Sequence, residues 1–287
     1  MDKYKAIWIS HSSLGDFLKC PRAYYLHNVY KDPKTKHKIQ VTSPSLSLGQ
    51  AVHQVIESLS QLSTKQRFHE SLLDRYEHAW RQVSGRIGGF TSQEVEVKYK
   101  ERGRAMLERV HHNPGPLKNL TVKIKQELPY YWISEEDNII LCGKIDWLEY
   151  LPETDSVHII DFKTSKSEED LNSLQLPIYH LLVHNCQKRK VGKASYWYLE
   201  FEDELSEKTL PDLDEAKQRV MTIAKKIKLS KQLGKLSCPK GAAGCYACRP
   251  FEKVLRGEAE LVGLDNYHHD VYIIPDDADN RQESELI

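Results

Sequence analysis

The chain has 287 residues, of which 40% are hydrophobic and 29% charged, a composition typical of a soluble globular protein with an apolar core. Its apolar runs fall short of the ~20 residues that span a bilayer, and its first residues lack the apolar core of a signal peptide. We therefore expect a cytosolic protein with no membrane contact. The 41 basic residues balance the 41 acidic ones, which argues against a uniformly basic nucleic-acid-binding protein but allows local basic patches.

The N-terminal part has a helical pattern. An amphipathic segment predicts a helix beginning near Ser12 or Ser13, and Pro21 suits the first turn of the next helix. Residues 31–44 are polar, basic and proline-containing, so we expect a loop. Helical spacing of apolar residues resumes at residue 49 and continues to about residue 112, with breaks near Gly85.

From about residue 119 the pattern changes to strands. Expected strands cover residues 120–128, 130–133, 138–150 and 157–162, separated by polar turns of hairpin length. A helix over residues 171–186, an aromatic-rich strand over 193–201 and a long basic helix over 213–233 follow.

This order predicts an α/β fold with a central mixed β-sheet flanked by helices and an N-terminal helical region. We expect one domain over residues 1–264. Its helical part covers about 45–118, its sheet core about 119–235, and its cysteine-rich closure 238–250. The acidic, polar residues 265–287 are expected to form a flexible tail.

Three charged residues interrupt the apolar runs of the expected strands. Asp161 and Lys163 are two positions apart, so their side chains share one face, and Asp146 belongs to the neighbouring strand. Buried charge is costly unless it is paired or bound to a metal. The structural explanation of the set is an ion pair or exposed positions at a sheet edge. The functional explanation is a site for a hard cation beside a lysine, which is what phosphodiester hydrolysis needs.

Three further polar residues are candidates with ordinary explanations as well. His53 follows Gly49 on an expected helix and could be a third metal ligand, although a single histidine is more often a surface or packed residue. Gln175 and Tyr179 are four positions apart and share a helix face. They could bind phosphate or base edges, or could be plain helix surface.

Together these motifs closely resemble the PD-(D/E)XK nuclease superfamily, and more narrowly its RecB-type branch, which includes RecB-like nucleases associated with CRISPR systems. The ordered motifs are Gly49…His53, Gly143-Lys-Ile-Asp146, Asp161-Phe-Lys163 and Gln175-Leu-x-x-Tyr179. The resemblance covers about residues 10–250 and includes an N-terminal segment ending in Cys20-Pro-Arg-x-Tyr24. It implies a restriction-endonuclease-like core.

The resemblance also implies a role for each residue. His53, Asp146, Asp161 and the backbone carbonyl of Phe162 match the ligands of Mg²⁺ or Mn²⁺. Lys163 matches the catalytic lysine, and with Asp146 and Asp161 it forms the catalytic set. One or two metal ions are compatible with these ligands.

Residues beside this set are expected to meet DNA. Gln175 and Tyr179 match the motif that holds DNA at the site. Lys144 could contact phosphate or be a solvated lysine. Glu127 could assist the metal or stand at a sheet edge, and we favour the edge.

The implied activity is that of a metal-dependent deoxyribonuclease, an exonuclease on single-stranded DNA ends in DNA repair, recombination or CRISPR adaptation. A separate helicase or CRISPR adaptation protein is the expected partner. The competing interpretation is a subunit of such an assembly that grips DNA without cutting it, and the intact Asp161 and Lys163 argue against it. A metal-dependent enzyme with a different substrate is a third interpretation.

Four of the six cysteines form a separate set, namely Cys20, Cys238, Cys245 and Cys248. Some RecB-type nucleases hold a [4Fe-4S] cluster with one N-terminal and three C-terminal cysteines, so the resemblance implies such a cluster here. The C-x6-C-x2-C spacing departs from the usual C-x2-C-x5-C. Tetrahedral zinc and unliganded thiols are the alternatives.

Overall fold

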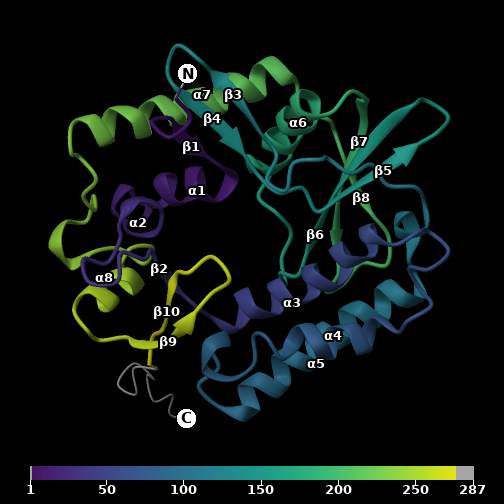
Figure 1. Cartoon of the computed structure of the whole chain (residues 1–287), viewed down its shortest axis with the longest axis horizontal. Coiled ribbons are helices and arrows are strands. Elements are labelled where there is room, and N and C mark those ends of the chain that lie inside the picture. Colours follow the sequence, from purple (N-terminus) through teal and green to yellow (C-terminus); the bar gives the residue numbers. More distant parts are fainter. Residues whose placement is uncertain (1, 276–287) are drawn as a thin grey trace, which may run out of the picture.

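A computed structural model describes residues 2–275 (Figure 1). Its α-helices are α1 (His11–Lys19), α2 (Pro21–Tyr24), α3 (Pro44–Ser58), α4 (Leu72–Trp80), α5 (Gln93–His112), α6 (Gln175–Cys186), α7 (Leu213–Gln232) and α8 (Arg249–Leu255). Its strands are β1 (Ile7–Ile9), β2 (Ile39–Val41), β3 (Tyr130–Ser134), β4 (Ile139–Cys142), β5 (Trp147–Leu151), β6 (Ser156–Lys163), β7 (Lys190–Tyr198), β8 (Ser206–Lys208), β9 (Glu260–Leu264) and β10 (Asp270–Ile273). No helix in this range is long and apolar enough to cross a membrane.

The largest sheet has the order β5-β6-β7-β8, and its central pair, β6 and β7, is parallel while the outer pairs are antiparallel. Alternate residues of β6 face opposite layers. Ile159 packs in the apolar cluster with α6 and α7, whereas Ile160 and Phe162 pack with α3, α4 and α5. Helices thus cover both faces of a mixed sheet, which confirms the predicted α/β class (Figure 1).

The expected strand over residues 138–150 is divided between two sheets. β4 pairs with β1 and β3, and β5 pairs with β6, so the chain turns out of one sheet and into the other at residues 143–146. The amide of Gly143 donates to the carbonyl of Pro129 at 3.1 Å, which ties this break to the segment before β3. Asp146 therefore lies at a break between strands rather than within one.

The prediction of a strand over residues 120–128 was wrong. Thr121 bridges Glu149, and Val122 N donates to Leu148 O at 2.8 Å, but residues 123–128 belong to no strand. The apolar–polar alternation persists there without a neighbouring backbone to pair with, so the pattern overstated the strand.

A third sheet, β2-β10-β9, corrects two expectations. Residues 39–41 lie in the expected loop and residues 270–273 in the expected tail, yet they pair as parallel strands. The carboxylate of Asp270 is 2% exposed and accepts from Thr35 Oγ1 at 2.5 Å, and its other oxygen lies 2.8 Å from His37 Nδ1. These polar partners let a short strand form in a segment whose composition suggested disorder. Residues 276–287 of the expected tail lie outside the described range.

The helical layer agrees with the sequence pattern, and its ends have local causes. Ser10 caps α1 in a reciprocal capping box with Ser13, so the helix begins at His11, one or two residues before the expected position. Ser43 caps α3, and Pro44 occupies its first turn. Helix α3 packs against the face of the largest sheet that includes Ile160 and Phe162, and it places His53 beside Asp146.

Candidate active site

Three parts of the fold bring the candidate active-site residues together. Asp161 and Lys163 come from the end of β6, Asp146 from the break before β5, and His53 from the middle of α3. The predicted common face of Asp161 and Lys163 is confirmed, because Lys163 Nζ lies 3.0 Å from Asp161 Oδ2.

Asp146 is held from two sides. Its Oδ2 accepts from the Phe162 amide at 3.0 Å and lies 3.3 Å from His53 Nδ1. Burial acts to raise the pKa of Asp146, but His53 and the Phe162 amide outweigh it and hold that pKa below its ordinary value. The carboxylate is therefore ionised and fixed in direction. The Phe162 carbonyl remains a predicted ligand.

Asp161 is almost completely buried, at 1% exposure. Its Oδ1 accepts from Gln175 Nε2 at 2.7 Å, while its buried Oδ2, although close to the ammonium group of Lys163, makes no hydrogen bond of proper geometry. Burial, together with repulsion from Asp146, raises the pKa of Asp161 to about 7. Asp161 Oδ2 therefore has an ion-pair partner in Lys163 but keeps capacity to bind a further cation.

A third acidic residue, Glu57, which the sequence reasoning missed, also lies in this group. Donor atoms of His53, Glu57 and Asp146 all lie within 4.8 Å of one another. Burial lowers the pKa of His53, but Asp146, Asp161 and Glu57 raise it to about 9, because three carboxylates surround the imidazole. His53 and Glu57 are four residues apart on α3, and this spacing was the signal that could have identified Glu57.

Lys163 is surrounded by acceptors. Besides Asp161, it contacts the side-chain oxygen of Gln175 and lies 2.9 Å from Glu169 Oε2. Burial lowers the pKa of Lys163, and Asp161 and Glu169 raise it above its ordinary value, so the lysine is charged. The structural ion pair that we considered is present, and it lies among the candidate metal ligands. Glu169, from the loop after β6, had no sequence signal.

Gln175 and Tyr179 face this group rather than an open surface. They are 8% and 7% exposed, and Gln175 Nε2 lies 3.2 Å from Tyr179 Oη. Gln175 thus links Asp161, Lys163 and Tyr179 in one buried network. The structure brings both residues to the site but gives them partners within the protein.

A comparison with family models matches residues 8–250 to the PD-(D/E)XK nuclease superfamily. The chain belongs to this superfamily. Among solved structures, the chain is similar to a protein described as a putative exonuclease from Eubacterium rectale, with 15% identity and a TM-score of 0.51 over 84% of this chain and 87% of that one. At this identity the likeness concerns the fold. No match was found among curated proteins.

A groove of about 850 Å³ leads to the nuclease site from outside. One wall is the irregular segment 121–129, and the other includes residues 144–148, Glu57 and Tyr267. Lys144 contacts Glu57 and remains largely exposed at this wall. Glu127 is exposed in the irregular segment and lines the groove, so its expected position on an edge strand was wrong.

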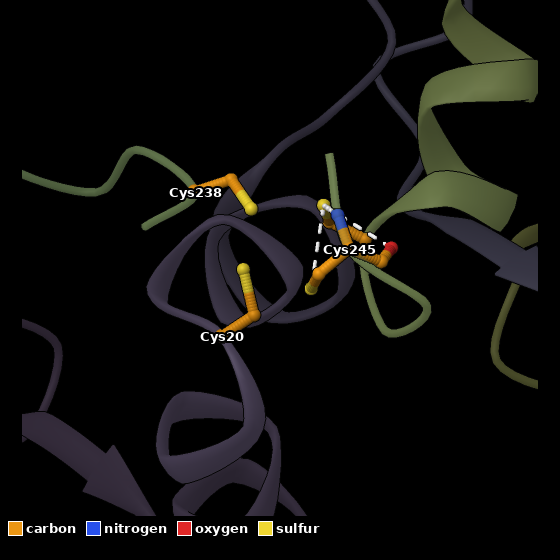
Figure 2. Close-up of side chains that lie close together, drawn as sticks. Cys20, Cys238 and Cys245 are labelled. Atoms are coloured by element: carbon orange, nitrogen blue, oxygen red, sulfur yellow. Dashed lines mark hydrogen bonds between the residues drawn. The ribbon is translucent and has the colours of Figure 1, made fainter. Parts of the chain in front are cut away.

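The four cysteines of the predicted metal-binding set form a second cluster, separate from the acidic group (Figure 2). The sulfur atoms of Cys20, Cys238, Cys245 and Cys248 all lie within 4.8 Å of one another, and those of Cys245 and Cys248 are 3.8 Å apart. Burial raises the pKa of Cys245, but the Cys248 and Ala247 amides and the neighbouring thiols lower it to about 7. Burial raises the pKa of the Cys20 thiol and raises that of Cys248 to about 12. The four cysteines therefore form a candidate metal site that joins the start of α2 to the region before α8.

Proposed function

We propose that this protein is a Mg²⁺- or Mn²⁺-dependent deoxyribonuclease. The observation that carries the proposal is the convergence of His53, Glu57 and Asp146, whose donor atoms all lie within 4.8 Å of one another, next to the buried carboxylate of Asp161. Carboxylate oxygens with one imidazole suit a hard divalent ion that keeps several waters. The oxygen-rich donor set thus supports the metal dependence implied by the family resemblance.

When bound, the metal supplies a water of lowered pKa and a positive charge for the phosphate oxygen. The protein's own residues prepare the rest. Asp146 and Asp161 would hold the metal, with His53 and Glu57 beside them. Lys163 keeps an ammonium charge where negative charge develops at phosphorus, and Gln175 fixes both Lys163 and Asp161 in direction.

The groove supports a single strand as substrate. It is open at the surface and is lined by Lys123, Lys125 and Lys144 as well as by Asp146. We propose that it admits single-stranded DNA ends, so that the enzyme is an exonuclease. A role in DNA repair, recombination or CRISPR adaptation, in the cytosol and beside a separate helicase or adaptation protein, is our proposal from the family resemblance.

The alternative is a nuclease-fold subunit that binds DNA without cutting it. The test is cleavage of end-labelled single-stranded DNA with Mg²⁺ or Mn²⁺, comparing wild type with Asp161→Ala, Lys163→Ala and the control Asp203→Ala. Asp203 is exposed and pairs with Arg109 away from the site. We expect only the control to retain activity. Equal activity in all variants would refute the assigned site, and binding without cleavage by wild type would support the alternative.

Blocking the 5′ or the 3′ end of the same oligonucleotide tests the exonuclease proposal. An exonuclease should be stopped by one of the two blocks and release mononucleotides or short products from the other end. Cleavage of a strand blocked at both ends would instead identify an endonuclease.

For the four cysteines, the sulfur spacing favours zinc over the [4Fe-4S] cluster implied by the resemblance. Zn–S bonds of about 2.3 Å place the sulfurs of a tetrahedral site about 3.8 Å apart. This value matches the 3.8 Å between Cys245 and Cys248. A cubane cluster holds its thiolates farther apart, because each one binds a different iron. We therefore propose a structural zinc ion.

Metal analysis of protein purified without air tests this proposal. About one zinc per chain and a colourless solution are expected. Bound iron with broad visible absorbance would overturn zinc in favour of the cluster, and absence of both metals would identify free thiols.

A further inference from the structure

The turn between β9 and β10 carries an exposed aromatic side chain at the nuclease groove. Tyr267 is 79% exposed and lines the groove with Lys144 and Asp146. Single exposed aromatic residues are common on protein surfaces. Tyr267 differs because it lines the same groove as Glu57 and Asp146 of the candidate active site.

The backbone that carries Tyr267 is held firmly. Asp265 Oδ1 accepts from the amides of Tyr267 and His269, each at 2.8 Å, and Asp265 Oδ2 lies 2.8 Å from His269 Nδ1. The rings of Tyr267 and His269 have centroids 6.0 Å apart and are tilted by 30°. The turn thus fixes the backbone position of Tyr267, and the strands on either side join it to the third sheet.

The remaining groove lining suits a phosphate backbone. Lys123 and Lys125 are exposed on the irregular segment, and Lys144 is exposed on the other wall. Lys123 also donates to Gln61 Oε1 at 2.5 Å, which fixes its direction. Lysines beside an exposed ring are the combination by which proteins bind single strands, because the ammonium groups follow phosphates while bases stack on the ring.

We propose that Tyr267 stacks on an unpaired base of a nucleic-acid strand whose backbone runs past these lysines toward Asp146. This inference rests on the proposed nuclease function and gives it a substrate class, the unpaired strand. Within a duplex, a base is stacked between its neighbours and its face is not free for a protein ring. The hairpin therefore selects single strands or frayed ends.

The test is binding of a fluorescently labelled single-stranded oligonucleotide to the full-length protein with Ca²⁺ in place of Mg²⁺. Tyr267→Ala should weaken binding by about 5- to 150-fold, the loss expected for one stacked base. Tyr267→Phe keeps the ring and should stay within about twofold of wild type. Tyr246→Ala is the control, because Tyr246 is 72% exposed outside the groove lining.

A blunt duplex of the same sequence separates stacking from a general loss of affinity. Its binding should change less than that of the single strand when Tyr267 is replaced by alanine. Equal loss for both forms, or equal loss in the Phe and Ala variants, would overturn stacking.

Cleavage assays distinguish this failure from failure of the proposed function. If Tyr267→Ala binds single strands as wild type does, while wild type cleaves and Asp161→Ala does not, stacking is refuted and the nuclease stands. If wild type neither binds nor cleaves any strand, both proposals fail.

Discussion

Replacing Gln175 with methionine separates two roles for this residue, DNA contact and positioning. Methionine has a similar length but cannot form the bonds to Asp161 and Lys163. A hydrogen bond to a charged group is worth about 1.5–3 kcal/mol. Loss of one such bond in the transition state corresponds to a fall in kcat of about 10- to 150-fold. We expect this fall with little change in affinity, because Gln175 is buried and its side chain faces the protein.

The assay is single-turnover cleavage of a labelled single-stranded oligonucleotide, with affinity measured separately in Ca²⁺. Gln82→Met is the matched control, because Gln82 is exposed and bonds Gln54 in the helical layer. If Gln175→Met keeps its rate and loses affinity, Gln175 contacts DNA as the sequence motif implied, and the positioning argument is wrong.

Three further predictions concern stability. Cys238→Ser should abolish stoichiometric metal binding and lower Tm, measured by metal analysis and calorimetry, because a structural site needs all four ligands. Gly103→Ala should lower Tm by about 2–10 °C, because a Cβ would lie 2.0 Å from the hydroxyl of Tyr76 and overpacking costs about 1–3 kcal/mol; an unchanged melting curve would contradict that contact. For the pair of His27 with Asp16, burial opposes both charges, but the pair outweighs it, raising the pKa of His27 above 6.5 and lowering that of Asp16 below 3.8. The stabilisation from His27 is present below pH 6.5 and is lost as pH rises through its raised pKa, so the Tm gap between wild type and His27→Gln should be larger at about pH 5.5 than at about pH 9.

The sequence predicted the shared face of Asp161 and Lys163 better than it predicted the backbone around Asp146. Asp161 and Lys163 followed from the period of a strand, which is a local property. The break at residues 143–146 did not, because it depends on β4 and β5 joining different sheets, and their residues are apolar on both sides of the break. The motif around Asp146 was therefore placed on a continuous strand that does not exist, and its catalytic role stays a prediction.

Long-range pairing explains the other differences between the sequence predictions and the structure. β2 and β10 are short, and neither has a pattern that distinguishes it from a loop or a polar tail. Each becomes a strand only through the other, and the buried Asp270 acquires its partners from residues near the N-terminus. Glu169 was missed for the same reason, since only the fold brings its loop to Lys163.

The third sheet has a consequence for the order in which the protein is made. Thr35 bonds Asp270, 235 positions later, so this contact waits for nearly the whole chain. His53, Asp146, Asp161 and Gln175 are all synthesised before the β9–β10 hairpin. A nascent chain that still lacks this hairpin cannot form the third sheet, and its groove lacks the wall that carries Tyr267. Completion of the groove therefore waits for synthesis of the β9–β10 hairpin, which comes after synthesis of the candidate site residues.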